Sequence, residues 1–434
     1  MSENGNDQNG KLGERTLRVR MYRVGFGDCF LLSVPVVKEG KRVHRHFVVD
    51  CGVHGRGNIG TIERAVDNIA EVTDKKLAAI IATHSHQDHI SGFSEKFCSF
   101  DIEEVWLPWC ENQLDELAIK WQRKEAALVE RLDRHFTAQA KIGDAAANTT
   151  ERKSALSAVA NLVRNKKAMQ LLRSGFGTGA KVRYLEAGKT LSSPADAPGL
   201  TVRFLGPPRD EKFLAKMHPP VDQRYLQLDA SGTAGEMQNL LEPFPSKWRV
   251  DAEEMKIYPH RLAEAEEKAL QEQLSDSSLN SLAFALDHVK NNTSLVALFM
   301  IRGQYLLFPG DAEYGNWRYW LDEEEAEEIL PRITFLKVGH HGSFNATPRA
   351  ALEKMSEGEF AAMVSTQSTP WESIPRVPLM ERLDERTRQK IVRSDWIDVP
   401  NAPPPLAGAL PQMPANFAKE FKRGEFWFDY EIEL

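Results

Sequence analysis

The stretch ATHSHQDHISG, residues 82–92, places three histidines and one aspartate within six positions. Imidazole nitrogens and carboxylate oxygens are ligands that zinc, manganese and iron accept in proteins. His84 and His86 are two positions apart, so both can face one ion on an extended or turning backbone. Asp88 and His89 follow at the place where a second ion would lie. Because structural zinc sites usually contain cysteine and this cluster has none, the pattern predicts an open, catalytic metal site.

The histidine cluster follows a run of apolar residues at 77–82 that is typical of a buried strand. Before it, residues 60–75 carry apolar side chains at helical spacing, and residues 17–50 alternate in the manner of strands. The expected order is three strands, a helix and a fourth strand that ends in the histidines. Ligands of open α/β sheets gather beyond the carboxyl ends of strands, which is where this cluster is expected to lie.

A second group of strands is predicted nearer the C-terminus. Strand patterns occur at 180–188, 200–208, 293–311, 333–343 and 360–368. The Arg302-Gly303 pair has turn chemistry, so it divides 293–311 into a hairpin. The strand at 333–343 also ends in histidines, and a helix is expected around 348–357. Two separate groups of strands therefore each deliver histidines at a strand end.

Two segments depart from this alternation and are predicted to be helical insertions. Residues 111–175 are rich in helix-forming residues and predict two or three amphipathic helices, whereas 209–285 are polar and proline-dotted before a helical pattern returns. We expect both to cap or flank the metal cleft and to set substrate choice, although an oligomer interface is an open alternative. Residues 1–16 are polar and expected to be disordered, which leaves 17–434 as one domain with insertions.

The composition is that of a soluble globular protein, with 42% hydrophobic and 27% charged residues. No window approaches about 18 consecutive apolar residues, so no membrane span is expected, and the N-terminus lacks the apolar stretch of a signal peptide. Four cysteines are too scattered for a disulfide framework and fit a reducing compartment. We therefore predict a cytoplasmic protein without a membrane partner. The net charge of −7 argues against a surface coated in basic residues for duplex DNA, but a local basic groove stays open.

The segment ATHSHQDHISG resembles the T-H-x-H-x-D-H-x-G motif of the metallo-β-lactamase superfamily. Three further segments resemble other motifs of that superfamily in the same order: FVVDCG, LLFPGDAE and LKVGHHGS. Together with GDCFLL, they are most similar to the metallo-β-lactamase domain of the ComEC competence proteins, whose transmembrane part has no counterpart in this sequence. The resemblance covers roughly residues 17–110 and 180–375, with gaps, and leaves the helical insert and most of 209–285 unmatched.

The resemblance implies an α/β fold, the αββα metallo-β-lactamase sandwich with helical insertions. Two mixed sheets would lie face to face, with helices outside and metals at one edge. It also implies two divalent ions, Zn²⁺ or Mn²⁺. The implied ligands are, for the first ion, His84, His86 and Asp311 and, for the second, Asp88, His89, Asp311 and either His340 or His341. The sequence leaves the choice between the last two histidines open.

One motif departs from the superfamily pattern. Many members carry a histidine just before the hairpin strand that leads to the aspartate corresponding to Asp311. Here Lys290-Asn291-Asn292 occupies that place, and ComEC-type proteins also have asparagine there. The first ion would then be completed by solvent or by substrate, with Asn292 as a substrate contact. Alternatively, His288 would substitute for the missing ligand.

Three other residues are expected to act around the ions. Asp50, in FVVDCG, is expected to accept a hydrogen bond from a ligand histidine and fix its tautomer, or else to serve a strand-end turn. Ser343 is expected to hold a phosphate oxygen, or else to cap the following helix. Arg56, in a glycine-rich loop, is a predicted contact for an anionic substrate. Asp50, Asp88 and Ser343 are accordingly the predicted catalytic residues.

Two ions bridged by Asp311 would lower the pKa of a bound water and make it a hydroxide nucleophile. The ComEC-like pattern implies a phosphodiesterase, and first of all a nuclease, acting on DNA or another nucleotide substrate. The alternative is a small-molecule hydrolase for a cyclic nucleotide, a lactone or a phosphorylated metabolite. The acidic net charge favours that alternative, because long polyanions need several neutralised phosphates. A third is a non-catalytic metal-binding sensor module. Protein partners and oligomeric state stay open.

Overall fold

The structure is a computed structural model that describes residues 12–56, 59–142, 165–216, 218–220, 223–225, 276–367, 374–397, 412–414 and 419–434. Within these ranges, side chains are described except at 56, 131, 133, 135–142 and 276–281. The lead-in 1–11, residues 143–164 of the first predicted insertion and 226–275 of the second lie outside the described chain. All the predicted metal ligands lie within it.

Two mixed β-sheets form the centre of the molecule. The first has the order β16-β17-β1-β3-β4-β6-β7-β8 and comprises β1 (Thr16–Tyr22), β3 (Cys29–Lys38), β4 (Lys41–Cys51), β6 (Lys76–Ile81), β7 (Asp101–Pro108), β8 (Lys181–Leu185), β16 (Phe421–Arg423) and β17 (Trp427–Glu433). The second has the order β15-β14-β13-β12-β11-β10-β9 and comprises β9 (Thr190–Ser192), β10 (Thr201–Gly206), β11 (Val296–Ile301), β12 (Gln304–Phe308), β13 (Phe335–Lys337), β14 (Ala361–Val364) and β15 (Ile391–Arg393). A small additional sheet pairs β2 (Gly25–Phe26) with β5 (Gly55–Arg56).

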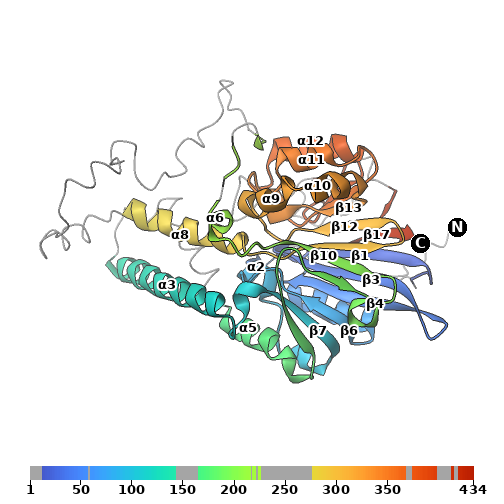
Figure 1. Cartoon of the computed structure of the whole chain (residues 1–434), viewed down its shortest axis with the longest axis horizontal. Helices are drawn as coiled ribbons and strands as arrows, with labels where there is room; N and C mark the ends of the chain where they lie inside the picture. The colour runs from blue at the N-terminus through green and yellow to red at the C-terminus, as the bar shows by residue number, and fades with distance from the viewer. Residues whose placement is uncertain are drawn as a thin grey trace, which may run out of the picture.

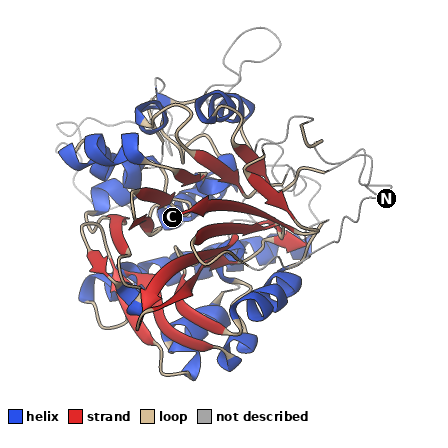
Figure 2. Ribbon diagram, turned by 90° about the vertical axis from the view of Figure 1, so that its right-hand side faces the viewer, coloured by secondary structure: helices blue, strands red, loops and turns tan. Residues whose placement is uncertain are grey.

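Helices cover the outer face of each sheet, and Figure 2 shows the strands in the interior between them. The first sheet is covered by α1 (Ile62–Thr73) and α5 (Lys166–Arg173). The second is covered by α9 (Tyr314–Leu321), α10 (Glu324–Ile329), α11 (Arg349–Lys354) and α12 (Val377–Thr387). This arrangement confirms the predicted αββα sandwich. No helix in the described ranges combines the length and apolar character needed to cross a lipid bilayer.

Two further helices lie beside the sandwich. The helices α3 (Glu116–Ile142) and α8 (Asp276–Asn291) come from the predicted insertions and run side by side away from the sheets (Figure 1). The helices α2 (Gln87–Ile90) and α6 (Glu211–Leu214) are single turns. Because α8 continues past residue 285, one helix joins the second predicted insertion directly to the loop before β11.

The two sheets face each other through buried aromatic side chains. Phe30 of β3 meets Phe308 of β12 with ring centroids 6.0 Å apart, and Trp106 of β7 meets Phe204 of β10 at 5.8 Å. Both pairs are edge-to-face at 82°, an arrangement that aromatic quadrupoles favour. The strand β7 was not among the predicted strands, because two adjacent glutamates interrupt the apolar pattern of DIEEVWLP. The ring of Trp106 attaches β7 to the core.

The strand ends that carry the predicted ligands converge at one edge of this core. The backbone N–H of Leu295, before β11, donates to the carbonyl of Thr83 at 2.9 Å, and that of His340 donates to Gly310 at 3.4 Å. Gly310 has a φ of +56°, and an added Cβ would lie 2.8 Å from the Cβ of Thr83. Only glycine fits this contact. The predicted hairpin at Arg302-Gly303 is confirmed by the pairing of β11 with β12.

A buried ion pair joins β1 and β17, two neighbouring strands of the first sheet that come from opposite ends of the chain. Arg20 of β1 donates two hydrogen bonds, each 2.7 Å long, to the carboxylate of Asp429 on β17. A third nitrogen of the guanidinium donates to Asn68 of α1 at 2.8 Å, and the group lies 3.8 Å from the ring centroid of Trp427. The pair therefore connects two strands and a helix, with every partner shielded from water.

We predict that Asp429→Ala destabilises the protein by about 3–5 kcal/mol, because it leaves the Arg20 guanidinium buried without its carboxylate. Denaturant unfolding followed by circular dichroism measures the effect. Glu431→Ala, two residues along the same strand in a partly exposed pair with Lys422, is the matched control and should change stability by no more than about 1 kcal/mol. Equal effects of the two substitutions would contradict the assignment.

Candidate metal centre

Four segments bring the predicted ligands to the shared edge of the sheets. His84 and His86 lie in the loop after β6, and Asp88 and His89 lie in the single turn of α2 that follows. Asp311 follows β12. His340 and His341 lie in a turn, η10 (Gly339–Gly342), that follows β13. Each segment thus presents its side chains directly after a strand, as the sequence predicts.

Asp88, His89, Asp311 and His341 form a buried group whose candidate ligand atoms lie within 4.8 Å of one another. His341 Nε2 is 3.2 Å from Asp88 Oδ2 and 3.5 Å from Asp311 Oδ2. His89 Nε2 is 3.0 Å from the same oxygen of Asp311. These are the residues that the resemblance implies for the second ion, with His341 in place of the open choice.

His340 points away from this group. Its Nδ1 is 3.6 Å from Glu313 Oε1, its Nε2 is 3.4 Å from the side-chain nitrogen of Asn291, and its side chain is 15% exposed. Both His340 and His341 have positive φ, at 44° and 54°. Consecutive left-handed residues turn the chain sharply, so the two side chains leave the turn in different directions. Two adjacent histidines in sequence therefore occupy different environments.

His84 and His86 lie beside the four-residue group. Their rings face each other, with His84 Nε2 3.0 Å from His86 Nδ1, and the ring of His84 lies 4.1 Å from that of His89 between centroids. Both rings are buried. His288 does not join them, because its Nδ1 is 2.6 Å from the carboxylate of Glu313. This placement differs from the alternative that His288 replaces the histidine that many superfamily members carry just before this hairpin.

Asp50 holds His89 in place from the side opposite the group. Its Oδ2 is 2.8 Å from His89 Nδ1, and its carboxylate also accepts from the backbone N–H and the hydroxyl of Thr83, both at 2.7 Å. A carboxylate at Nδ1 leaves Nε2 of His89 directed at Asp311. Asp50 has a φ of 54° within β4, where the pairing with β3 shifts register.

Two charged residues of this region were not predicted from the sequence, Asp28 and Lys337. The ammonium group of Lys337 contacts Asp28 Oδ2, lies 3.1 Å from Asp311 Oδ1 and donates to the carbonyl of Gly310 at 2.9 Å. Asp311 Oδ1 also accepts from the backbone N–H of His340. Only Oδ2 of Asp311 is therefore left for the buried group. A lysine within the apolar strand FLK was the available signal.

The charges of this region influence one another strongly. Burial lowers the pKa of His89, but the carboxylates of Asp311 and Asp50 outweigh it and raise that pKa well above its ordinary value. Burial raises the pKa of Asp88, but His341 and His89 outweigh it and hold the pKa well below its ordinary range. The low pKa of Asp88 favours its ionised form, which attracts positive charge.

The atoms around this space suit a divalent cation. Asp88 Oδ1 is buried without a hydrogen-bond partner, and His89 Nε2, although near Asp311, lacks a well-directed hydrogen bond. Buried polar atoms are rarely left in this state. Nitrogen and oxygen donors without cysteine are the set expected for Zn²⁺ or Mn²⁺ in an open site. The described residues therefore fit the metal centre that the sequence predicts.

The predicted substrate contacts are placed differently. The amide of Asn292 is buried, donates to the carbonyls of Leu214 and Lys216 at 3.0 Å, and accepts from the backbone at Glu313 and Asn316. With its amide fully engaged, Asn292 has a bracing role and not the predicted substrate contact.

Ser343 is also engaged within the protein. Its hydroxyl donates to Asn345 at 2.7 Å and its backbone N–H donates to the carbonyl of His340 at 2.8 Å. Both donors that were expected to hold a phosphate oxygen are therefore paired within the protein, and the phosphate contact stays a prediction. The side chain of Arg56 lies outside the described side chains, so its predicted contact stays a prediction.

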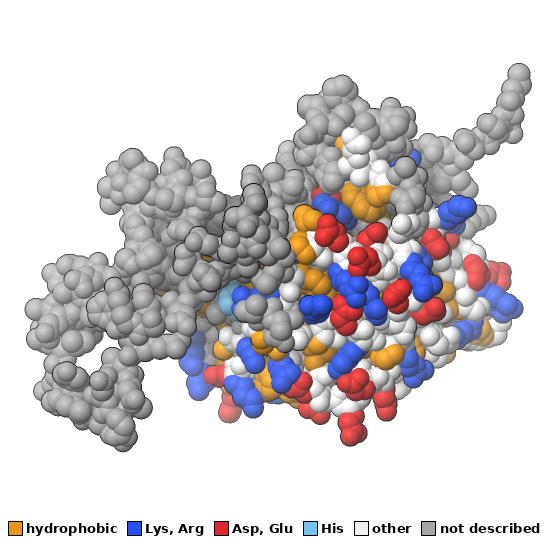
Figure 3. All heavy atoms as spheres, turned by 90° about the horizontal axis from the view of Figure 1, so that it is seen from above, with side chains coloured by type: hydrophobic (Ala, Val, Ile, Leu, Met, Phe, Trp, Pro, Cys, Tyr) orange, Lys and Arg blue, Asp and Glu red, His pale blue; other side chains and the backbone are white. Residues whose placement is uncertain are grey.

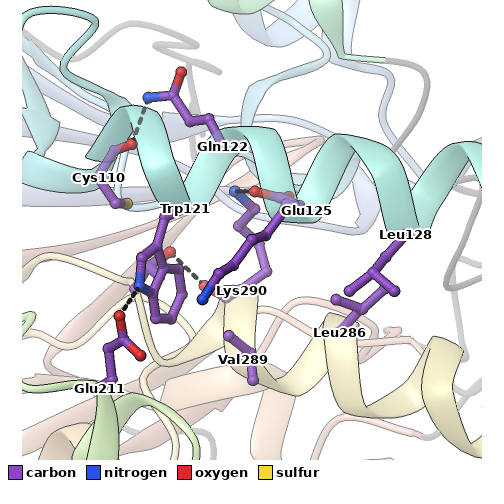
Figure 4. Close-up of a pocket in the computed structure, with 11 residues that line it drawn as sticks. Cys110, Trp121, Gln122, Glu125, Leu128, Glu211, Leu286, Val289 and Lys290 are labelled. Carbon is purple, nitrogen blue, oxygen red and sulfur yellow. Dashed lines mark hydrogen bonds and ion pairs between the residues drawn. The ribbon is translucent and has the colours of Figure 1, made fainter. Parts of the chain in front are cut away.

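A cavity of about 150 Å³ lies between α3 and α8 (Figure 4), and none of the described residues that line it is a histidine. Trp121, Glu125 and Leu128 of α3 and Leu286 and Val289 of α8 are among its lining residues.

Lys290, in the segment where many superfamily members carry a histidine, also lines this cavity. Its ammonium group lies 2.9 Å from Glu125 and 3.4 Å from Glu111. Lys290 therefore pairs with α3 and does not face the histidine cluster.

We predict that His341→Ala weakens binding of the second ion by more than about 100-fold, because it removes a ligand from the buried group and not merely an outer partner. Titration of metal-free protein with Zn²⁺ against a chelating dye measures the affinity. His340→Ala is the matched control from the next residue and should bind zinc like the wild type. A loss in His340→Ala with normal binding in His341→Ala would reverse the assignment.

Comparison with known proteins gives one family match. The model of the metallo-β-lactamase superfamily matches residues 27–95, and no curated protein matches the chain in sequence. Among solved structures, the chain is similar to a beta-lactamase domain protein from Burkholderia ambifaria, at 15% identity over 45% of this chain and 46% of that chain, with a TM-score of 0.24. The chain thus spans less than half of that protein.

The family match covers the part of the chain that builds the centre. Residues 27–95 include Asp28, Asp50 and the whole histidine cluster, together with β3, β4, α1, β6 and α2. None of the matches singles out the ComEC type, so that narrower resemblance stays a prediction. Residues 27–95 are thus similar in sequence to the metallo-β-lactamase superfamily, and the two facing mixed sheets with a buried group of histidines and aspartates at their common edge agree with that match.

Proposed function

We propose that the protein is a metal-dependent phosphodiesterase that cleaves a nucleotide substrate, with a nucleic acid strand as its first candidate. The observation that carries the proposal is the buried group of Asp88, His89, Asp311 and His341 at the strand ends. A group of this composition is suited to hold an ion at the place where open α/β sheets bind their ligands.

Divalent ions held by these residues would supply Lewis-acid chemistry, activating water near neutral pH and polarising the phosphoryl group. The protein's own groups prepare the position. Asp50 orients His89, and Lys337 holds Oδ1 of Asp311 so that Oδ2 faces His89 and His341. The Lys337 ammonium also favours the ionised form of Asp311, which is the form that binds metal.

An aromatic and basic group next to the turn that carries His341 supports a nucleotide as substrate. The ring of Phe344 stacks on that of His218, with the ring centroids 5.7 Å apart and an angle of 23° between the ring planes. The guanidinium of Arg376 lies 5.5 Å from the centroid of Phe344, and its backbone N–H donates to Gly342 at 2.9 Å. Aromatic rings stack on bases and arginine binds phosphate, so this pair of features suits both parts of a nucleotide.

The charge distribution favours a second candidate, a hydrolase of a cyclic nucleotide, a lactone or a phosphorylated metabolite. On the face shown in Figure 3, Lys and Arg side chains are interspersed with Asp and Glu across the described residues and form no continuous basic stripe. The net charge of the chain is −7. A long polyanion gains affinity by neutralising several phosphates, so this face offers it little.

We predict that Asp88→Ala lowers phosphodiester cleavage on the order of 1,000-fold, because the reacting group loses electrostatic stabilisation at a buried site. Initial rates with bis(p-nitrophenyl) phosphate, in protein loaded with Zn²⁺ or Mn²⁺, measure the loss. Glu95→Ala, which removes an exposed carboxylate seven residues away in a pair with Lys167, should retain the wild-type rate. Full metal content and full activity in Asp88→Ala would refute the assignment.

Salt dependence separates the two candidate substrates. If a single strand is the substrate, KM for single-stranded DNA rises steeply with salt, with log KM increasing linearly with log salt as counterions are released. A cyclic nucleotide would show a nearly flat dependence. The measurement is a panel of single-stranded DNA, duplex DNA, RNA and cyclic nucleotides at several salt concentrations. A metal-loaded wild type that binds these compounds and turns over none of them would favour the sensor module instead.

A further inference from the structure

An aspartate on α8 faces the outer nitrogen of His86. Asp287 Oδ1 lies 3.3 Å from His86 Nε2, and neither atom makes a well-directed hydrogen bond among the described residues. The side chain of His86 is 2% exposed and that of Asp287 is 20% exposed. A buried ring nitrogen without a partner is unfavourable, so the carboxylate is the natural acceptor for an Nε2–H of His86.

The inner nitrogen of His86 faces His84, whose tautomer follows from its own neighbours. His84 Nδ1 lies 3.1 Å from the hydroxyl oxygen of Thr83. That hydroxyl donates its hydrogen to Asp50 at 2.7 Å, so it can only accept from His84. The hydroxyl of Ser294, 3.2 Å from the same nitrogen, accepts from the backbone N–H of Asp311 and can also accept from His84. A hydrogen on Nδ1 of His84 suits both oxygens, whereas a bare Nδ1 would set its lone pair against that of Thr83, so Nε2 presents a lone pair to His86 Nδ1 at 3.0 Å.

Two arrangements of His86 are then possible. With its hydrogen on Nδ1, His86 would donate to His84, and this hydrogen bond would remove both nitrogens from metal binding. With its hydrogen on Nε2, His86 would donate to Asp287 and face His84 with a second lone pair. Two lone pairs 3.0 Å apart repel each other until a cation lies between them, so the second arrangement prepares the pair for an ion and needs the carboxylate to hold the hydrogen on Nε2.

We propose that Asp287 is a positioning residue that selects the metal-binding tautomer of His86. The inference rests on the proposed function only in taking His84 and His86 as ligands of the first ion. The carboxylate comes from α8, the helix that joins the second predicted insertion to β11 (Figure 1). Asp287 lies three residues before Lys290-Asn291-Asn292, the segment where many superfamily members carry a histidine, so the insertion would support the first ion through His86.

The test compares Asp287→Ala with Asp287→Asn in the full chain. The amide oxygen of asparagine can still accept from Nε2–H, whereas alanine cannot. In metal-free protein labelled with ¹⁵N-histidine, with His86 assigned from the spectrum of His86→Gln, we expect Nε2 protonated and Nδ1 bare in the wild type and in Asp287→Asn. In Asp287→Ala we expect the hydrogen to move toward Nδ1.

Zinc titration provides the second readout. Affinity for the first ion should fall about 10–100-fold in Asp287→Ala, the range for losing an outer partner of a ligand histidine, and only a few-fold in Asp287→Asn. A wild-type His86 protonated on Nδ1, or an equal loss in both variants, would overturn the proposal. Neither readout needs turnover, so it can hold even if the protein cleaves no phosphodiester. Thermal unfolding of both variants checks that they are folded.

Discussion

Burying several carboxylates beside a cluster of histidines, at the edge that two sheets share, is the constraint on which the rest of the structure depends. Buried charges are costly unless opposite charge and hydrogen bonds compensate them. Here Lys337 reaches Asp28 and Asp311, and Thr83 donates twice to Asp50. The compensation leaves Asp88 Oδ1 unpaired. Lys337 and Thr83 thus compensate the carboxylates on the side of the sheets, whereas Asp88 Oδ1 has no partner on the side where a cation is proposed to bind.

This constraint also explains why the two sheets must meet closely. Ligands that follow β6, β12 and β13 come together only if those strands end at the same level, and the buried aromatic layer between the sheets holds them there. Gly310 and Thr83 show this requirement most directly, because a side chain at position 310 would collide with Thr83. The metal centre and the core therefore depend on the same packing of the two sheets, so a substitution that shifts one also shifts the other.

The helix α8 contributes to the centre without supplying one of the predicted ligands. Lys290 pairs with Glu125 of α3, which fixes the helix to its neighbour (Figure 4). Asp287 precedes Lys290 by three residues, so it lies on the same side of the helix, and its carboxylate faces His86. The contact with α3 therefore helps to place that carboxylate.

Local patterns in the sequence determined the histidine cluster at a strand end and the Arg302-Gly303 hairpin, because periodicity and turn chemistry act over a few residues. The αββα layering was implied by the resemblance to the metallo-β-lactamase superfamily. The tertiary structure alone distinguished His341 from His340, since adjacent left-handed residues send them in different directions. It also engaged Asn292 and Ser343 within the protein and brought Lys337 to Asp28 and Asp287 to His86. Lys337 and Asp28 are far apart in the chain, as are Asp287 and His86, and only the packing of sheets and helices brings the members of each pair within contact distance.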